Sequence, residues 1–118
     1  MTVIYDKVAV IGMGLIGASI ALATRRAGLA TTIFGSDQSP EVAAVVARLQ
    51  LVDSFEADAV HAVADADLVI LAVPVGAVGE IAEQIVPHMK SGAVLTDTGS
   101  TKRSVVRDVG PHLRDDII

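Results

Sequence analysis

The sequence has no cysteine, and only 3% of its residues are aromatic. A chain without cysteine forms neither a disulfide framework nor a cysteine-based metal site, and the absence fits a cytoplasmic protein in a reducing compartment. Since aromatic side chains are rare while 52% of all residues are hydrophobic, the core must consist mainly of Ala, Val, Ile and Leu. Such cores are typical of parallel sheets that helices cover on both faces.

Positive charge is also scarce, with nine lysines and arginines against fourteen acids and a net charge of −5. The sequence has no basic patch, so we expect no nucleic-acid partner. The histidines His61, His88 and His112 lack metal-ligand spacing and an acidic partner one helical turn away. We therefore expect no metal site and no catalytic base among them. Asp65 and Asp67 are interpreted as solvated loop residues.

The chain lacks a hydrophobic run long enough to cross a membrane. The apolar segment Val8–Ala23 has sixteen residues, fewer than the roughly 20 that span a bilayer, and glycine and serine interrupt it. No small-residue cleavage site follows, which argues against a signal peptide. For 118 residues we expect a single domain and no membrane partner.

The most informative segment joins the apolar run Val8–Ile11 to the pattern G-x-G-x-x-G that follows it. The run predicts a buried strand. Gly12 then allows a tight turn, Gly14 lets a pyrophosphate approach the backbone, and Gly17 lets the next helix pack closely. The start of that helix offers N–H groups and the positive end of its dipole to phosphates. The predicted dinucleotide-binding residues here are Gly12, Met13, Gly14, Leu15, Ile16 and Gly17.

An acid lies where such a site needs one. Asp37 follows Gly17 by twenty residues, directly after Ser36. Its carboxylate can accept hydrogen bonds from ribose hydroxyls and would repel a 2′-phosphate, and no Lys or Arg follows before Arg48. Ser36 and Asp37 are thus predicted cofactor residues, and NAD is favoured over NADP. The S-adenosylmethionine methyltransferases share a glycine-rich first turn and a similarly placed acid, so they remain an alternative.

The rest of the chain alternates between short apolar runs and helical periodicity, which predicts βαβ units. We expect strands at 7–11, 31–35, 54–55, 68–73 and 93–96. Helices are expected at 15–27, from Pro40 onward, before Pro87 and at 102–108, with a short helix or turn at 57–66. Gly28 marks a helix end and Ser39 a helix start. Two helical stripes are predicted to be buried: Val42, Val45, Val46 and Leu49, and Val78, Ile81, Ala82 and Ile85.

This order of elements predicts a Rossmann-type α/β fold, doubly wound around a mostly parallel sheet. Residues 115–118 look like the start of a further strand. We therefore expect residues 1–118 to be a dinucleotide-binding domain that is truncated before its last strand or strands.

Two more segments follow predicted strands. Val73, Pro74 and Val75 lie where doubly wound sheets bind ligands and could cover the adenosine half of a cofactor, although the proline could simply end the strand. Thr98 and Ser100 follow the 93–96 strand and could contact nicotinamide or substrate. Ser100 could equally be a helix cap with no role in chemistry.

Four motifs together resemble the N-terminal domain of the prephenate/arogenate (cyclohexadienyl) dehydrogenases. They lie at 8–19, 35–37, 65–75 and 95–102, of which Thr96-Asp97-Thr98-Gly99-Ser100-Thr101-Lys102 is the most specific. The resemblance implies that Gly12–Gly17 hold the pyrophosphate, Asp37 the ribose, and Val73–Val75 the adenosine side. It also implies that Ser100 lies beside nicotinamide and supports catalysis by hydrogen bonds to the substrate and to a catalytic histidine.

The same resemblance implies oxidative decarboxylation of prephenate or arogenate on the way to tyrosine, by a cytoplasmic enzyme that is a homodimer when full length. The family's catalytic histidine, substrate-binding arginines and helical dimerisation domain are expected beyond residue 118, so these residues alone should bind NAD without turnover. Two alternatives stay open. One is another NAD(P)-dependent dehydrogenase of the β-hydroxyacid type, and the other is a non-catalytic nucleotide-sensing module.

Overall fold

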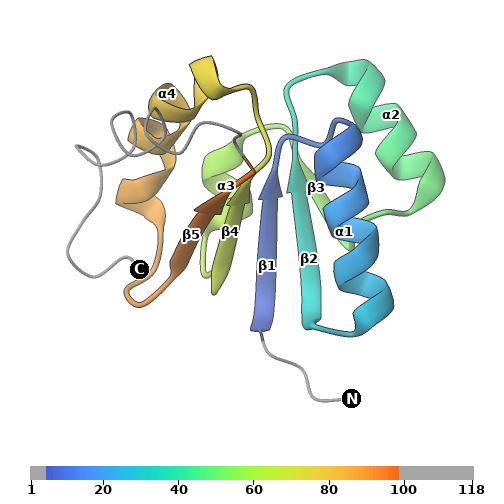
Figure 1. Cartoon of the computed structure of the whole chain (residues 1–118), viewed down its shortest axis with the longest axis horizontal. Coiled ribbons are helices and arrows are strands. Elements are labelled where there is room, and N and C mark those ends of the chain that lie inside the picture. Colours follow the sequence, from blue (N-terminus) through green and yellow to red (C-terminus); the bar gives the residue numbers. More distant parts are fainter. Residues whose placement is uncertain (1–4, 99–118) are drawn as a thin grey trace.

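A five-stranded, fully parallel sheet in the order β3-β2-β1-β4-β5 organises the chain (Figure 1). The computed structural model describes residues 5–98. The strands are β1 (Tyr5–Ile11), β2 (Ala30–Ser36), β3 (Ser54–Glu56), β4 (Leu68–Leu71) and β5 (Val94–Asp97). The helices are α1 (Leu15–Ala27), α2 (Pro40–Leu49), α3 (Ala59–Val63) and α4 (Val75–Ile85), followed by the 3-10 turn η1 (Val86–His88). The predicted doubly wound α/β fold is confirmed, and the strand order reverses between β1 and β4.

The central strand β1 divides its side chains between two cores because successive residues point to opposite faces. Val8 and Val10 pack with residues of α1 and α2, whereas Ala9 and Ile11 pack with residues of α3 and α4. Helices therefore cover both faces of the sheet (Figure 1). All four β1 residues are buried, and the two cores are built almost entirely from aliphatic side chains, as the composition predicted.

Local signals predicted the helix ends well. The α1 helix has the expected bounds, and Gly28 follows it in the left-handed conformation with φ 65°. The α2 helix begins at Pro40, and the Ser39 hydroxyl accepts a hydrogen bond from the backbone N–H of Val42 at 3.3 Å. The strands expected at 7–11, 31–35, 54–55 and 93–96 lie within two residues of their observed bounds. The turn expected at 57–66 contains α3 with His61.

Two expectations were wrong in detail. The strand predicted at 68–73 ends at Leu71, because its neighbour β1 also ends there and offers no further ladder partners. In α2, Val46 is buried, but Val45 and Leu49 are 41% and 55% exposed. The α2 helix contacts the three-residue edge strand β3, which is too short to cover the whole predicted stripe.

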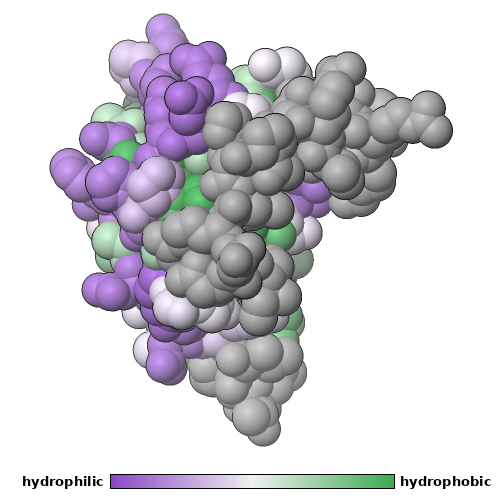
Figure 2. Space-filling model, turned by 90° about the vertical axis from the view of Figure 1, so that its left-hand side faces the viewer, coloured by the Kyte–Doolittle hydropathy of each residue, from purple (hydrophilic) through white to green (hydrophobic). Residues whose placement is uncertain are grey.

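The described surface on the side that bears α4 is mainly hydrophilic, with a small hydrophobic area near the middle of the view (Figure 2). Among residues 5–98, no helix combines the length and hydrophobicity needed to cross a membrane. Within that same range, no group of three or more His, Asp or Glu side chains is arranged to hold a metal ion. The helix expected at 102–108 and the strand expected from Asp115 lie outside the described residues.

Candidate functional site

The carboxyl ends of the strands form a single row at one edge of the sheet. In the strand register, Ile11 pairs with both Ser36 and Leu71, Ser36 pairs with Glu56, and Leu71 pairs with Asp97. Residues that follow the ends of β1, β2, β3 and β4 line a cleft of about 620 Å³, which lies in the size range of small-molecule sites. Because the strand order reverses between β1 and β4, this edge is where doubly wound folds bind ligands.

The turn after β1 is compact and depends on two glycines. Gly12 has φ +94°, and a Cβ there would lie 2.5 Å from the Ala72 carbonyl oxygen. A Cβ at Gly17 would lie 1.8 Å from the Gly12 carbonyl oxygen, so α1 starts directly against the turn. Gly14 differs, since a Cβ there would meet no atom within 4 Å. The turn therefore leaves the backbone at Gly14 accessible to a ligand.

The first turn of α1 is well suited to an anion. Its N-cap residue is Gly14, no side chain caps the helix, and no acid lies in its first turn. The side chains of Leu15 and Ile16 are 86% and 56% exposed. Among the described residues, no side chain accepts a hydrogen bond from the N–H groups at this helix start, which also bears the positive end of the helix dipole. Free N–H groups and the positive end of a helix dipole are the features by which helix starts bind phosphate groups.

Asp37 lies at the cleft and also contacts the glycine turn. Its Oδ2 accepts a hydrogen bond from the backbone N–H of Met13, and its Oδ1 accepts one from the N–H of Ser39, each at 2.9 Å. Ser36 is buried and lines the cleft beside Asp37. The predicted acid is thus in place, but it has backbone partners that the spacing alone did not indicate.

The far side of the cleft comes from α3 and α4. Val73 and Pro74 line it, and Pro74 is the N-cap residue of α4. Val75 is the first residue of α4. Three carboxylate residues line the cleft and no lysine or arginine does, among the residues the structure describes. The lining residues are Ile11, Gly12, Gly14, Ser36, Asp37, Gln38, Ala57, Asp58, Ala59, Ala72, Val73, Pro74, Ala77, Glu80, Ile81 and Gln84.

Thr98 follows β5 and is tied to the neighbouring strand. Its backbone N–H donates to the Leu71 carbonyl at 3.1 Å, and its hydroxyl donates to the same oxygen at 3.4 Å. Thr98 does not line the cleft. Ser100, the predicted supporting catalytic residue, lies outside the described residues.

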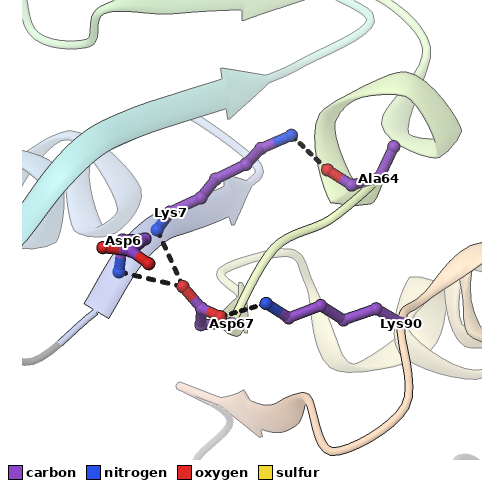
Figure 3. Close-up of polar contacts among 5 residues, drawn as sticks. All are labelled: Asp6, Lys7, Ala64, Asp67 and Lys90. Carbon is purple, nitrogen blue, oxygen red and sulfur yellow. Dashed lines mark hydrogen bonds and ion pairs between the residues drawn. The ribbon is translucent and has the colours of Figure 1, made fainter.

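Asp67 was misinterpreted as a solvated loop residue. It precedes β4 at the opposite end of the sheet, where its Oδ2 accepts hydrogen bonds from the N–H groups of Asp6 and Lys7, each at 2.9 Å. Its Oδ1 also contacts the Lys90 ammonium group (Figure 3). That hydrogen bond from Lys90, together with the backbone donors, lowers the pKa of Asp67 below its usual value. This cluster joins β1 to β4 and is structural, since it lies far from the cleft.

Lys7 completes this cluster (Figure 3). Its ammonium group donates to the Ala64 carbonyl and lies 3.8 Å from the centre of the Phe34 ring. Partial burial lowers the pKa of Lys7, against the opposing effect of nearby acids. A lysine over an aromatic ring is a contact that sequence spacing does not reveal, because the two residues lie on neighbouring strands.

Comparison with known proteins gives consistent matches. Residues 20–118 match the family model described as prephenate dehydrogenase, nucleotide-binding domain. The chain is 38% identical over 115 residues to a cyclohexadienyl dehydrogenase from Zymomonas mobilis, covering 98% of this chain and 39% of that protein. It is 40% identical over 101 residues to a prephenate dehydrogenase from Lactococcus lactis, covering 85% of this chain and 28% of that protein.

Solved structures agree. A prephenate dehydrogenase from A. aeolicus, in complex with hydroxyphenyl propionate and NAD+, superposes with a TM-score of 0.84 at 29% identity, covering 95% of this chain and 40% of that one. An arogenate dehydrogenase from Synechocystis superposes with a TM-score of 0.81 at 28% identity, covering 90% of this chain and 37% of that one. A 3-hydroxyisobutyrate dehydrogenase from Mycobacterium tuberculosis superposes with a TM-score of 0.78 at 22% identity, and this likeness shows a shared fold alone. The chain spans well under half the length of these relatives.

Proposed function

This chain belongs to the family of prephenate dehydrogenase nucleotide-binding domains, and from that premise we propose that it binds NAD for an enzyme acting on prephenate or arogenate. The observation that carries the proposal is the glycine turn and uncapped helix start that open onto the cleft beside Asp37. A pyrophosphate is the anion that such a turn accommodates between two nucleosides.

Each part of the cleft suits one part of the dinucleotide. The backbone of Gly12–Gly17 binds the pyrophosphate, and the Asp37 carboxylate accepts hydrogen bonds from the adenosine ribose beside Ser36. The resemblance assigns Val73–Val75 to the adenosine side, and Thr98 and Ser100 to the nicotinamide side. The positions of Gly12, Gly14, Ser36, Asp37, Val73 and Pro74 around the cleft support the first assignments, whereas those of Thr98 and Ser100 rest on the resemblance alone.

NAD is preferred to NADP for an electrostatic reason. Asp37, Asp58 and Glu80 all line the cleft, and no described lysine or arginine lines it. A 2′-phosphate placed beside Asp37 would add negative charge where the protein has no cation to balance it. Asp37 therefore disfavours NADP, and no described cation of the cleft offsets its charge.

The activity of the whole enzyme is the oxidative decarboxylation of its ring-bearing substrate. Bound nicotinamide supplies the hydride acceptor for this reaction. The residues of this chain bind and orient that group, and Ser100 supports catalysis from the nicotinamide side. A homodimer is the proposed assembly of the complete enzyme, as the family resemblance implies. The present chain covers only 39% of the Zymomonas mobilis relative and 28% of the Lactococcus lactis relative.

Calorimetric titration with NAD, NADP and S-adenosylmethionine tests this function. We expect NAD to bind, NADP to bind at least about tenfold more weakly, and S-adenosylmethionine not to bind. Asp37→Ala should weaken NAD binding by about tenfold or more, the effect of losing a hydrogen bond to a charged group. Asp53→Ala is the matched control, because Asp53 accepts a backbone hydrogen bond from Ile33 and does not line the cleft. A chain that prefers S-adenosylmethionine, or binds none of the three, contradicts the proposal.

A further inference from the structure

Asp37 makes two backbone contacts that a ribose-binding role does not require. One of its oxygens accepts the N–H of Met13 and the other accepts the N–H of Ser39, both at 2.9 Å. The Ser39 contact is local, two residues along the chain. The Met13 contact spans 24 residues and reaches the middle of the glycine turn. A single carboxylate therefore joins the turn after β1 to the turn after β2.

The glycine turn has a flexible backbone that contacts with its neighbours must restrain. Met13 stands between Gly12 and Gly14, and glycine has more backbone freedom than any other residue. Two other contacts with β2 restrain the turn as well. The N–H of Gly12 donates to the Ser36 carbonyl at 2.7 Å, and the buried Met13 side chain packs close to Gly35, since its sulfur would lie only 3.0 Å from a Cβ there. The Asp37 carboxylate completes the set on the side that faces the cleft.

We propose that Asp37 is a positioning residue that holds the Gly12–Gly14 turn in its anion-binding conformation before the dinucleotide arrives. The proposal rests on the proposed function in one respect, that this turn receives the pyrophosphate. A binding site that is already ordered loses less conformational freedom when its ligand binds. Asp37 thus contributes to cofactor affinity through Met13 as well as through any contact with ribose.

The positioning role of Asp37 and a simple charge effect predict opposite changes in the affinity for an anion. A carboxylate beside an anion site repels the anion, so removing its charge should strengthen anion binding if charge were its only influence. Loss of the hydrogen bond to Met13 should instead weaken anion binding, because the turn is no longer ordered. The two effects have opposite signs for a ligand that has no ribose.

The experiment uses Asp37→Ser and inorganic pyrophosphate. A serine hydroxyl can still accept the N–H of Ser39 locally, but it is too short to reach Met13. We expect the Met13 amide hydrogen to exchange about tenfold faster than in the wild type without ligand, the effect of losing one hydrogen bond to a charged group. Pyrophosphate, titrated while amide resonances are recorded, should bind several-fold more weakly. Unchanged Met13 exchange, or equal or tighter pyrophosphate binding, overturns the proposal.

Two further variants sharpen the result. Asp53→Ser removes a similar contact, since the Asp53 carboxylate accepts the N–H of Ile33 at 2.7 Å. Asp53 does not line the cleft. This variant should lower stability without altering Met13 exchange or pyrophosphate binding. Asp37→Ala removes the acceptors for both Met13 and Ser39 and should reproduce the effects of Asp37→Ser. If neither Asp37 variant folds, the carboxylate serves the whole fold and a local positioning role is wrong.

The two proposals fail on different results. A wild-type chain that binds neither NAD nor pyrophosphate contradicts the proposed function. The exchange rate of Met13 is measured without any ligand, so it tests the positioning role alone.

Discussion

A missing methyl group at Gly17 decides how closely α1 approaches the turn after β1. The Cβ of any other residue would lie 1.8 Å from the Gly12 carbonyl oxygen, which is backbone and cannot rotate away. The helix would have to move outward and take its first N–H groups with it. The predicted need for glycine at this position is thus explained by a specific contact.

Gly17→Ala should destabilise the protein by about 1–3 kcal/mol, the usual cost of overpacking, and should also weaken NAD binding. The first effect is measured by urea unfolding and the second by calorimetry. Gly14→Ala should behave differently, since a Cβ there meets no atom within 4 Å. It should leave the free energy of unfolding nearly unchanged while weakening NAD binding, because the methyl group occupies the approach of the pyrophosphate.

Gly76→Ala in α4 is the control for both variants. A Cβ at Gly76 also meets no atom within 4 Å, and Gly76 does not line the cleft. This variant should retain NAD affinity, with stability unchanged or slightly raised by the better helix propensity of alanine. A Gly17→Ala protein as stable as Gly76→Ala would contradict the packing argument.

At the scale of elements, helix ends were predictable because their signals are local. The sequence Ser39-Pro40-Glu41 correctly predicted the start of α2, where the Ser39 hydroxyl accepts the N–H of Val42 and donates to Glu41. The buried face of α2 was not predictable to the same extent. Periodicity predicts a stripe, but how much of that stripe is covered depends on which strand lies beneath it, here the short strand β3.

Ser39→Ala should lower the free energy of unfolding by about 1 kcal/mol through loss of the N-cap. NAD affinity should be unchanged, because the contact from Ser39 to Asp37 uses the backbone N–H, which alanine keeps. Urea unfolding and calorimetry measure the two quantities. Ser39→Asp is the control, since aspartate is an equally good N-cap residue and should restore stability. A loss of stability in Ser39→Asp equal to that in Ser39→Ala would show that capping is not the cause.

At the scale of the whole molecule, the two ends of the sheet have different tasks. The carboxyl end carries the cleft, and the amino end carries the cluster of Asp67 with Asp6, Lys7 and Lys90 (Figure 3). This cluster holds the start of β1 against β4, and through Lys90 it also contacts the segment before β5. The register that aligns the strand ends around the cleft therefore depends partly on contacts at the other end.

Asp67→Asn should reduce stability at neutral pH by about 1–2 kcal/mol, since one carboxylate serves three donors. The folded pKa of Asp67 is lowered from 3.8, mainly by the hydrogen bond from Lys90. Its contribution is thus fully present above pH 3.8 and is lost as the pH falls through the lower folded value. The stability difference between wild type and Asp67→Asn should shrink below pH 3.8 in urea unfolding experiments.

Asp65→Asn is the control for that series. Asp65 is exposed and has φ 61°, a conformation that asparagine also tolerates. It should change stability little at any pH between 3 and 7. A difference between wild type and Asp67→Asn that stays constant down to pH 3 would contradict the assigned cause of the pKa shift.

The sequence by itself determined the fold class, the helix ends, the glycine turn and the presence of Asp37, because each depends on neighbouring residues or on a regular period. Only the tertiary structure decided that Asp37 holds Met13, that Asp67 joins β1 to β4, and that Val45 and Leu49 stay exposed. These features depend on which strands become neighbours and how far each one extends. Such distances between remote segments are set by packing of the whole sheet, and no local pattern carries them.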